Sequence, residues 1–91
     1  VKKLGKHIED YPFVEIEWAD IEGDAGWSST KQLKLEKLPI CVSKGYLVSQ
    51  QKGVTRIFTD YIKTKDKDTF EDIGNTTLIP TSVIQSIKIL N

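Results

Sequence analysis

The sequence predicts a mainly β protein whose five antiparallel strands surround one small core. Three observations support this prediction: strict alternation of apolar and acidic residues over 13–20, two strand-like runs joined by a turn at Gln51 to Gly53, and an apolar tail interrupted by one tight turn at residues 80–82. Period-two alternation is typical of half-buried antiparallel strands. With 91 residues, the chain is expected to form a single domain, residues 1–91, with a modest core that oligomerisation would extend.

Composition argues against several classes of protein. The 13 basic and 13 acidic residues balance, which removes the simple electrostatic case for nucleic acid or an anionic membrane. Cys41 is the only cysteine, so neither an intrachain disulfide nor a zinc cluster is expected. No apolar run approaches the roughly 20 residues of a membrane helix. We therefore expect a cytoplasmic protein that does not enter the membrane.

Residues 1–12 allow two interpretations. Leu4, Ile8 and Tyr11 would form one apolar stripe if residues 2–10 were helical, and Pro12 would end that helix. A glycine within this stretch weakens the helix by about 1 kcal/mol relative to alanine. A short N-terminal helix and a loose arm both remain open.

The first predicted strand covers residues 13–20, with Val14, Ile16 and Trp18 on one face and glutamates on the other. An acidic, glycine-containing loop follows. Its acids are spaced like the first ligands of a calcium loop, but the glycine and the bidentate glutamate of such a loop are missing. We therefore predict no metal site there.

Trp27 lies in this loop and has two interpretations. It could plug the end of a barrel or offer a stacking surface, and plugging is favoured because tryptophans usually bury most of their area. Ser29 to Gln32 has the form of a capping box, yet Leu33 and Leu35 alternate as in a strand. Only a connector is predicted before Pro39.

The second and third strands form the central hairpin. Residues 40–50 are partly apolar on both faces, as expected for a strand bent through a barrel wall, and Gly45 is the predicted bend. After the turn, residues 54–63 are rich in β-branched and aromatic side chains and are predicted as the third strand.

The C-terminal part is predicted to close the barrel. Residues 63–74 carry mixed charges and are predicted as a loop. Residues 76–80 and 83–90 are predicted as the last two strands, and the tight turn between them would bend one strand into the next around a barrel corner.

This layout is that of a small SH3-like barrel, and the chain resembles Sm-like proteins, in particular the small ones carried by phages and cyanophages. Gly45 resembles the glycine of the first Sm motif. The segment from Ile79 to Ile87 is similar to the second motif, in which an apolar residue precedes a tight turn and two more apolar positions follow. The resemblance covers residues 13–90 and consists mostly of hydrophobic spacing.

The resemblance implies a homo-oligomeric ring in which the fourth strand of one subunit pairs with the fifth strand of the next. The residues implied at that interface are Leu78, Ile79, Val83, Ile84, Ile87 and Ile89. It also implies RNA binding through an aromatic residue and an asparagine in the second-to-third strand loop and an Arg-Gly at the fourth-to-fifth turn. The sequence departs at both places, with Gln50, Gln51 and Lys52 in the loop and Pro80-Thr81 at the turn.

Two functions are therefore expected in order of preference. The first is a ring-forming Sm-like protein that binds RNA or another single-stranded nucleic acid, in the host-cell cytoplasm if the gene is a phage gene. Its candidate binding residues are Gln51, Lys52, Arg56 and Trp27. The alternative is an SH3-like protein-interaction module of a phage that uses Trp27, Tyr46 or Tyr61 as an aromatic platform. An enzyme is not expected, because the sequence contains no triad, paired-acid site or phosphate-binding glycine loop; nor is a cofactor or small-molecule substrate.

Overall fold

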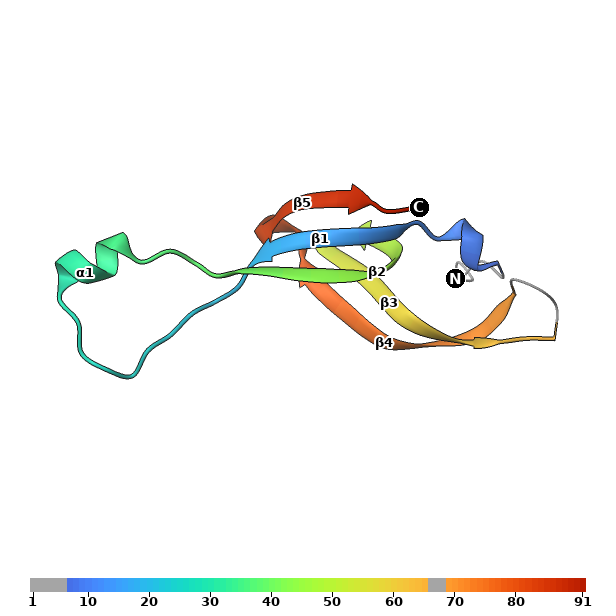
Figure 1. Cartoon of the computed structure of the whole chain (residues 1–91), viewed down its shortest axis with the longest axis horizontal. Helices are drawn as coiled ribbons and strands as arrows, with labels where there is room; N and C mark the ends of the chain where they lie inside the picture. The colour runs from blue at the N-terminus through green and yellow to red at the C-terminus, as the bar shows by residue number, and fades with distance from the viewer. Residues whose placement is uncertain (1–6, 66–68) are drawn as a thin grey trace.

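The computed structural model describes residues 7–65 and 69–91 and contains one five-stranded antiparallel sheet (Figure 1). The strands follow the spatial order β4-β3-β2-β1-β5. Their bounds are Phe13–Ala19 for β1, Ile40–Gln51 for β2, Val54–Lys63 for β3, Phe70–Pro80 for β4 and Ile84–Ile89 for β5. The described residues also form three short helices: η1 at Ile8–Asp10 before β1, α1 at Thr30–Leu35 between β1 and β2, and η2 at Thr81–Val83 between β4 and β5.

The β1 strand lies between β2 and β5 and confirms the alternation predicted for residues 13–20. Val14 and Ile16 are completely buried, and Trp18 packs against them while its indole Nε1 donates to Ser43 Oγ at 3.0 Å. The glutamates point away from this core, and Glu15 forms an ion pair with Lys44 on β2. One face of β1 therefore builds the core and the other carries charge.

The β2 strand passes very close to β3 at Gly45. A Cβ atom placed on Gly45 would lie 2.8 Å from the carbonyl oxygen of Phe58 and 3.2 Å from Cβ of Ile57. Only a residue without a side chain allows this approach. The sequence predicts Gly45 as a bend in this strand, and β2 does curve strongly in Figure 1. The structure adds that the close contact between β2 and β3 requires a glycine there.

The sheet is open, which corrects the predicted closed barrel. β4 and β5 form its two edges and do not pair with each other. The physical reason lies in η2, which leads the chain away from β4, after which β5 pairs with β1 on the far side of the sheet.

The predicted loop over residues 63–74 is wrong for its second half. β4 begins at Phe70 and pairs with β3 as far as Lys63. The charged residues Glu71 and Asp72 are exposed, whereas Phe70 is buried in the core. Pairing with the long β3 strand outweighs the mixed local composition.

The core consists of two clusters. The first contains Val14, Ile16, Ile57 and Ile79, and the second contains Tyr11, Phe58 and Phe70. Ile57 and Phe58 are consecutive in β3, so strand alternation points them to opposite faces of the sheet. The centre of the sheet is therefore covered on both sides, which explains why β2 and β3 are apolar on both faces.

The N-terminal segment covers the second cluster. Its described part forms a single 3-10 turn at Ile8–Asp10, and Ile8 and the buried Tyr11 pack on the cluster. The predicted helix over residues 2–10 lies mostly outside the described residues. Tyr11 meets Phe58 and Phe70 edge-on, at ring distances of 5.8 and 5.7 Å.

Residues 20–39 form an excursion, here called the arm, that extends from the β1–β2 end of the sheet (Figure 1). It includes α1, whose N-terminus has the predicted capping box: Ser29 Oγ accepts from the amide of Gln32, and the Gln32 side chain accepts from the amide of Ser29. Trp27 is fully exposed, so the prediction that it plugs a barrel end is wrong. An open sheet has no closed end for it to fill.

We expect Gly45→Ala to destabilise the fold by about 1–3 kcal/mol, the usual cost of overpacking, because its Cβ would collide with the backbone of Phe58. Urea unfolding followed by circular dichroism measures this. Gly23→Ala is the matched control, since a Cβ at Gly23 would meet no atom within 4 Å. A Gly45→Ala protein as stable as the Gly23→Ala control would contradict the close approach.

Candidate functional site

The site predicted from the sequence centres on the β2–β3 turn. Lys52 and Gly53 are its two central residues, with φ angles of 54° and 74°, and Gln51 pairs with Val54 across it. Positive φ at both central positions is the requirement of a type I′ turn, whose twist matches that of the flanking strands. Gln51, Lys52 and Gly53 are all exposed, so the turn presents an amide, an ammonium group and bare backbone to solvent.

The turn is held against the junction between β4 and β5. The amide of Thr81 donates to the carbonyl oxygen of Gly53 at 2.9 Å, and the hydroxyls of Thr55 and Thr81 lie 2.9 Å apart. Gln50 Nε2 donates to Thr55 Oγ1 at 3.2 Å. Thr55 is completely buried. These bonds join two loops that are distant in sequence into one ordered surface.

Arg56 supports the same turn from β3. Its Nη1 donates to the carbonyl oxygen of Gln51 at 3.3 Å and lies 3.5 Å from that of Val54. Over residues 7–65 and 69–91, the ion pair recorded within 4.0 Å joins Lys44 to Glu15, so Arg56 is not neutralised by a described carboxylate. The sequence left open whether Arg56 pairs with Asp60, with an acid of another subunit, or with no acid; among the described residues no pair with Asp60 is formed. Two positive charges, from Lys52 and Arg56, therefore belong to this surface.

Trp27 is not brought to this surface. It lies in the segment between β1 and α1, which extends away from the sheet in Figure 1, and its side chain is fully exposed. Of the four candidate binding residues, the structure therefore gathers Gln51, Lys52 and Arg56 and leaves Trp27 apart.

Thr55 and Thr81 were missed by reasoning from the sequence. They are 26 positions apart, and no local pattern links them. A threonine at an inward position of a predicted strand is a weak signal that a buried hydroxyl needs a partner. That partner becomes visible only when β4 pairs with β3.

The candidate interface residues divide by exposure. Ile79 is buried in the chain's own core, and Val83, Ile84 and Ile87 pack against the same cluster. Leu78 on β4 and Ile89 on β5 are 61% and 63% exposed. Of the six candidate interface residues, Leu78 on β4 and Ile89 on β5 are therefore the most accessible to a neighbouring copy.

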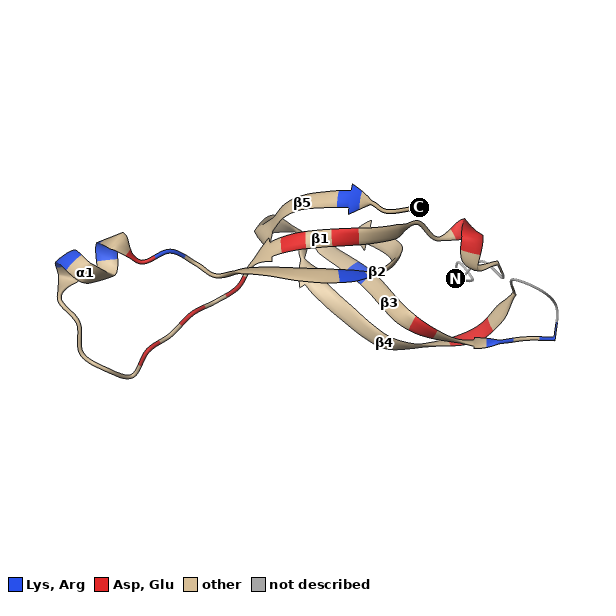
Figure 2. Ribbon diagram, in the orientation of Figure 1, with Lys and Arg blue, Asp and Glu red and all other residues tan. Residues whose placement is uncertain are grey.

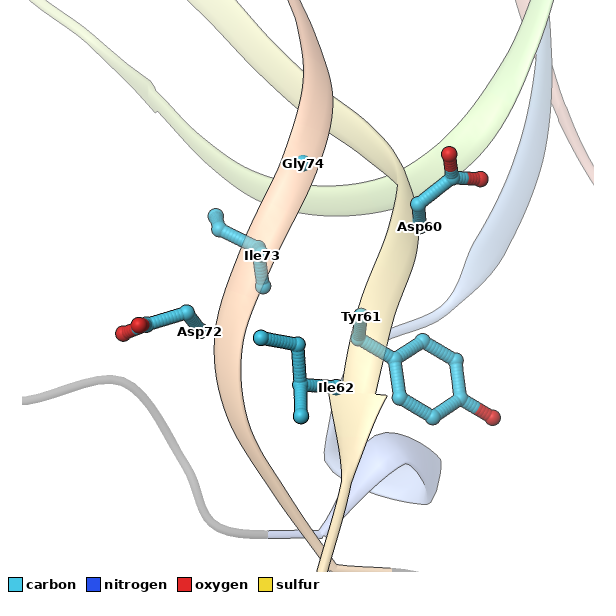
Figure 3. A pocket seen from close by; sticks show the side chains of 6 residues that line it. All are labelled: Asp60, Tyr61, Ile62, Asp72, Ile73 and Gly74. Atoms are coloured by element: carbon cyan, nitrogen blue, oxygen red, sulfur yellow. The ribbon is translucent and has the colours of Figure 1, made fainter.

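A shallow pocket of about 190 Å³ lies at the opposite end of β3 and β4 (Figure 3). Tyr61, Ile62 and Ile73 line it together with Asp60 and Asp72. Asp60 already accepts hydrogen bonds from Asn75 Nδ2 and from Thr59 Oγ1. One of the two lining acids is therefore engaged within the chain, and the rest of the lining named here is mainly apolar or aromatic.

The described residues contain no group of three or more His, Cys, Asp or Glu side chains arranged to hold a metal ion. Within the same residues, none of the helices is long and apolar enough to cross a membrane. Family models, curated proteins and solved structures were each compared with the chain, and none of the three gave a match.

Lys52→Asn should stabilise the protein by about 0.5–1 kcal/mol, because asparagine adopts the left-handed conformation more readily than lysine. Chemical denaturation at neutral pH measures the change. Gly53→Ala is the companion variant: space around Gly53 is open, yet its positive φ should make alanine destabilising by about 1 kcal/mol or more. A Lys52→Asn protein less stable than the parent would contradict the type I′ geometry.

Proposed function

We propose that this chain is a ring-forming Sm-like binding protein, in which the β4 edge of one copy pairs with the β5 edge of the next. The observation that carries the proposal is that β4 and β5 are the two edges of the sheet. Edge strands present unpaired N–H and C=O groups that another strand can satisfy. A contact between two different edges is head-to-tail, and it closes into a ring when the rotation between copies allows it.

The side chains on the two edges support this proposal. Leu78 and Ile89 expose large apolar groups on β4 and β5, where solvent contact is unfavourable. Burying them between copies would add apolar area to a domain whose own core is small. Backbone pairing and apolar burial would then act at the same edges.

The ligand that best suits the turn is single-stranded RNA. Lys52 and Arg56 supply two positive charges that phosphate groups can contact, and Gln51 supplies an amide for base edges. Because the net charge of the chain is zero, the affinity of one copy should be low. A ring would present one such turn per copy, and several weak contacts on one strand combine into a high apparent affinity.

The protein-interaction alternative receives less support. Tyr46 stacks on Phe58 at a ring distance of 5.3 Å, and Tyr61 meets Tyr46 and Phe70 at 6.0 and 5.7 Å. These rings take part in the chain's own packing. Among the aromatic residues considered for a platform, only Trp27 is fully exposed.

Light scattering after size exclusion tests the ring. We expect the parent protein to have the mass of a multimer, and Leu78→Lys/Ile89→Lys, here called the edge-blocked variant, to lose every species larger than a dimer. Lysines on edge strands disfavour pairing between sheets. Ile62→Lys is the matched control, because Ile62 is similarly exposed but lies on β3, outside the β4 and β5 edges that the ring would use. A parent protein that is monomeric across micromolar concentrations would refute the ring.

Fluorescence anisotropy with labelled oligo-U and oligo-A tests the ligand. We expect binding at low salt, and Lys52→Asn/Arg56→Gln should weaken it while reducing the salt slope of log K by about 0.7 for each phosphate group that is no longer bound. Lys65→Asn removes an exposed charge beyond the opposite end of β3 and should leave binding unchanged. Absence of binding at low salt would reject RNA as the ligand. The ring proposal would then depend only on the molar mass measured by light scattering.

A further inference from the structure

The arm, residues 20–39, has the properties of an interaction surface, and we propose that its partner is the arm of a second copy of this chain. The two arms would be related by a two-fold axis. This contact involves neither β4 nor β5, so it stands independently of ring formation.

The arm exposes an unusual amount of apolar surface. Of the twelve large hydrophobic side chains that are exposed among the described residues, five lie in the arm. They are Ile21, Trp27, Leu33, Leu35 and Leu38, with exposed fractions between 57% and 103%. Clustered exposed apolar side chains mark a place where another surface binds.

The arm is nevertheless ordered by its own hydrogen bonds. At its base the amide of Asp20 donates to the carbonyl oxygen of Pro39 at 3.0 Å. Near its turn Asp24 Oδ1 accepts from the amide of Gly26 at 2.8 Å, and the capping box fixes the start of α1. The exposed apolar side chains therefore lie on a segment whose backbone is held by hydrogen bonds at its base, near its turn and at the start of α1.

Charge is separated between the two limbs of the arm (Figure 2). The outgoing limb, residues 20–29, carries Asp20, Glu22 and Asp24 and no basic residue. The returning limb, residues 30–38, carries three lysines and one glutamate. In Figure 2 the red segments lie on the first limb and the blue segments lie mainly on α1 and beyond it.

This separation identifies the partner. A two-fold axis allows the acidic limb of each copy to lie against the basic limb of the other, and attraction between unlike charges favours that arrangement over one in which like limbs meet. A partner of one sign, such as RNA or an anionic membrane surface, would attract one limb and be repelled by the other. The arm is complementary to itself.

The size of the arm is sufficient for a stable contact. A standard interface uses about 20–30 residues on each side, and residues 20–39 alone provide about that number. Exposed ion pairs contribute little free energy individually, so burial of the five apolar side chains would supply the affinity. The charges would set the orientation and exclude other pairings.

Exchange of charge between the limbs tests the proposal in the edge-blocked variant, where lysines at Leu78 and Ile89 disfavour association through the sheet edges. Sedimentation equilibrium should show a dimer. Glu22→Lys/Asp24→Lys makes both limbs basic, and Lys31→Glu/Lys34→Glu makes both acidic. Each change should weaken the dimer at least tenfold. An equimolar mixture of the two should restore the parent dissociation constant to within about threefold, because each arm then meets its opposite.

Two further variants complete the experiment. Glu9→Lys/Asp10→Lys reverses two exposed acids outside the arm and should leave the dimer unchanged. Trp27→Ala should weaken the dimer while leaving the unfolding midpoint of the monomer unchanged, because the Trp27 side chain is fully exposed in the single chain. A monomeric edge-blocked variant, limb reversals without effect, or a mixture that stays monomeric would each overturn the proposal.

Discussion

The close approach of β2 and β3 at Gly45 is the constraint on which the rest of the structure depends. Because a Cβ at Gly45 would lie 2.8 Å from the carbonyl oxygen of Phe58, the strands can meet there only without a side chain. The two residues that β3 brings against Gly45, Ile57 and Phe58, point to opposite faces of the sheet and enter different core clusters. The small sheet is covered on both faces where the two strands approach, with β1 and β5 around one cluster and η1 and the start of β4 around the other.

The parts of the fold that were predictable depend on local patterns. The alternation of β1 and the β-branched, aromatic composition of β3 predict both strands almost to the residue, since each strand exposes one face along part of its length. The beginning of β4 carries exposed acids beside the buried Phe70, and Asn75 within the same strand has φ 51°. The beginning of β4 is extended because it pairs with β3, although its local sequence does not predict a strand. Whether the sheet closes into a barrel could not be predicted from local sequence patterns either, because closure depends on which strand β5 pairs with after η2.

The candidate site divides in the same way. The turn at Lys52 and Gly53 is encoded by adjacent residues and was predictable as a turn. Its attachment to the β4–β5 junction depends on the hydroxyls of Thr55 and Thr81, which only the complete sheet brings together. Trp27 was assigned by a general preference of tryptophan for burial. That preference requires an enclosed space near the loop, and an open sheet does not provide one.

The two proposed contacts differ in their physics, and this difference has a structural consequence. Pairing between the β4 and β5 edges uses backbone groups and joins unlike surfaces, so it propagates from copy to copy. Pairing between arms uses apolar side chains and separated charge, and it joins like surfaces, so it ends after two copies. A closed ring that also carries two-fold contacts would have dihedral symmetry, with two rings facing each other through their arms. The surfaces formed by Lys52 and Arg56 would then be repeated in both rings, and one strand would gain affinity from the second ring only where it can span both sets of surfaces.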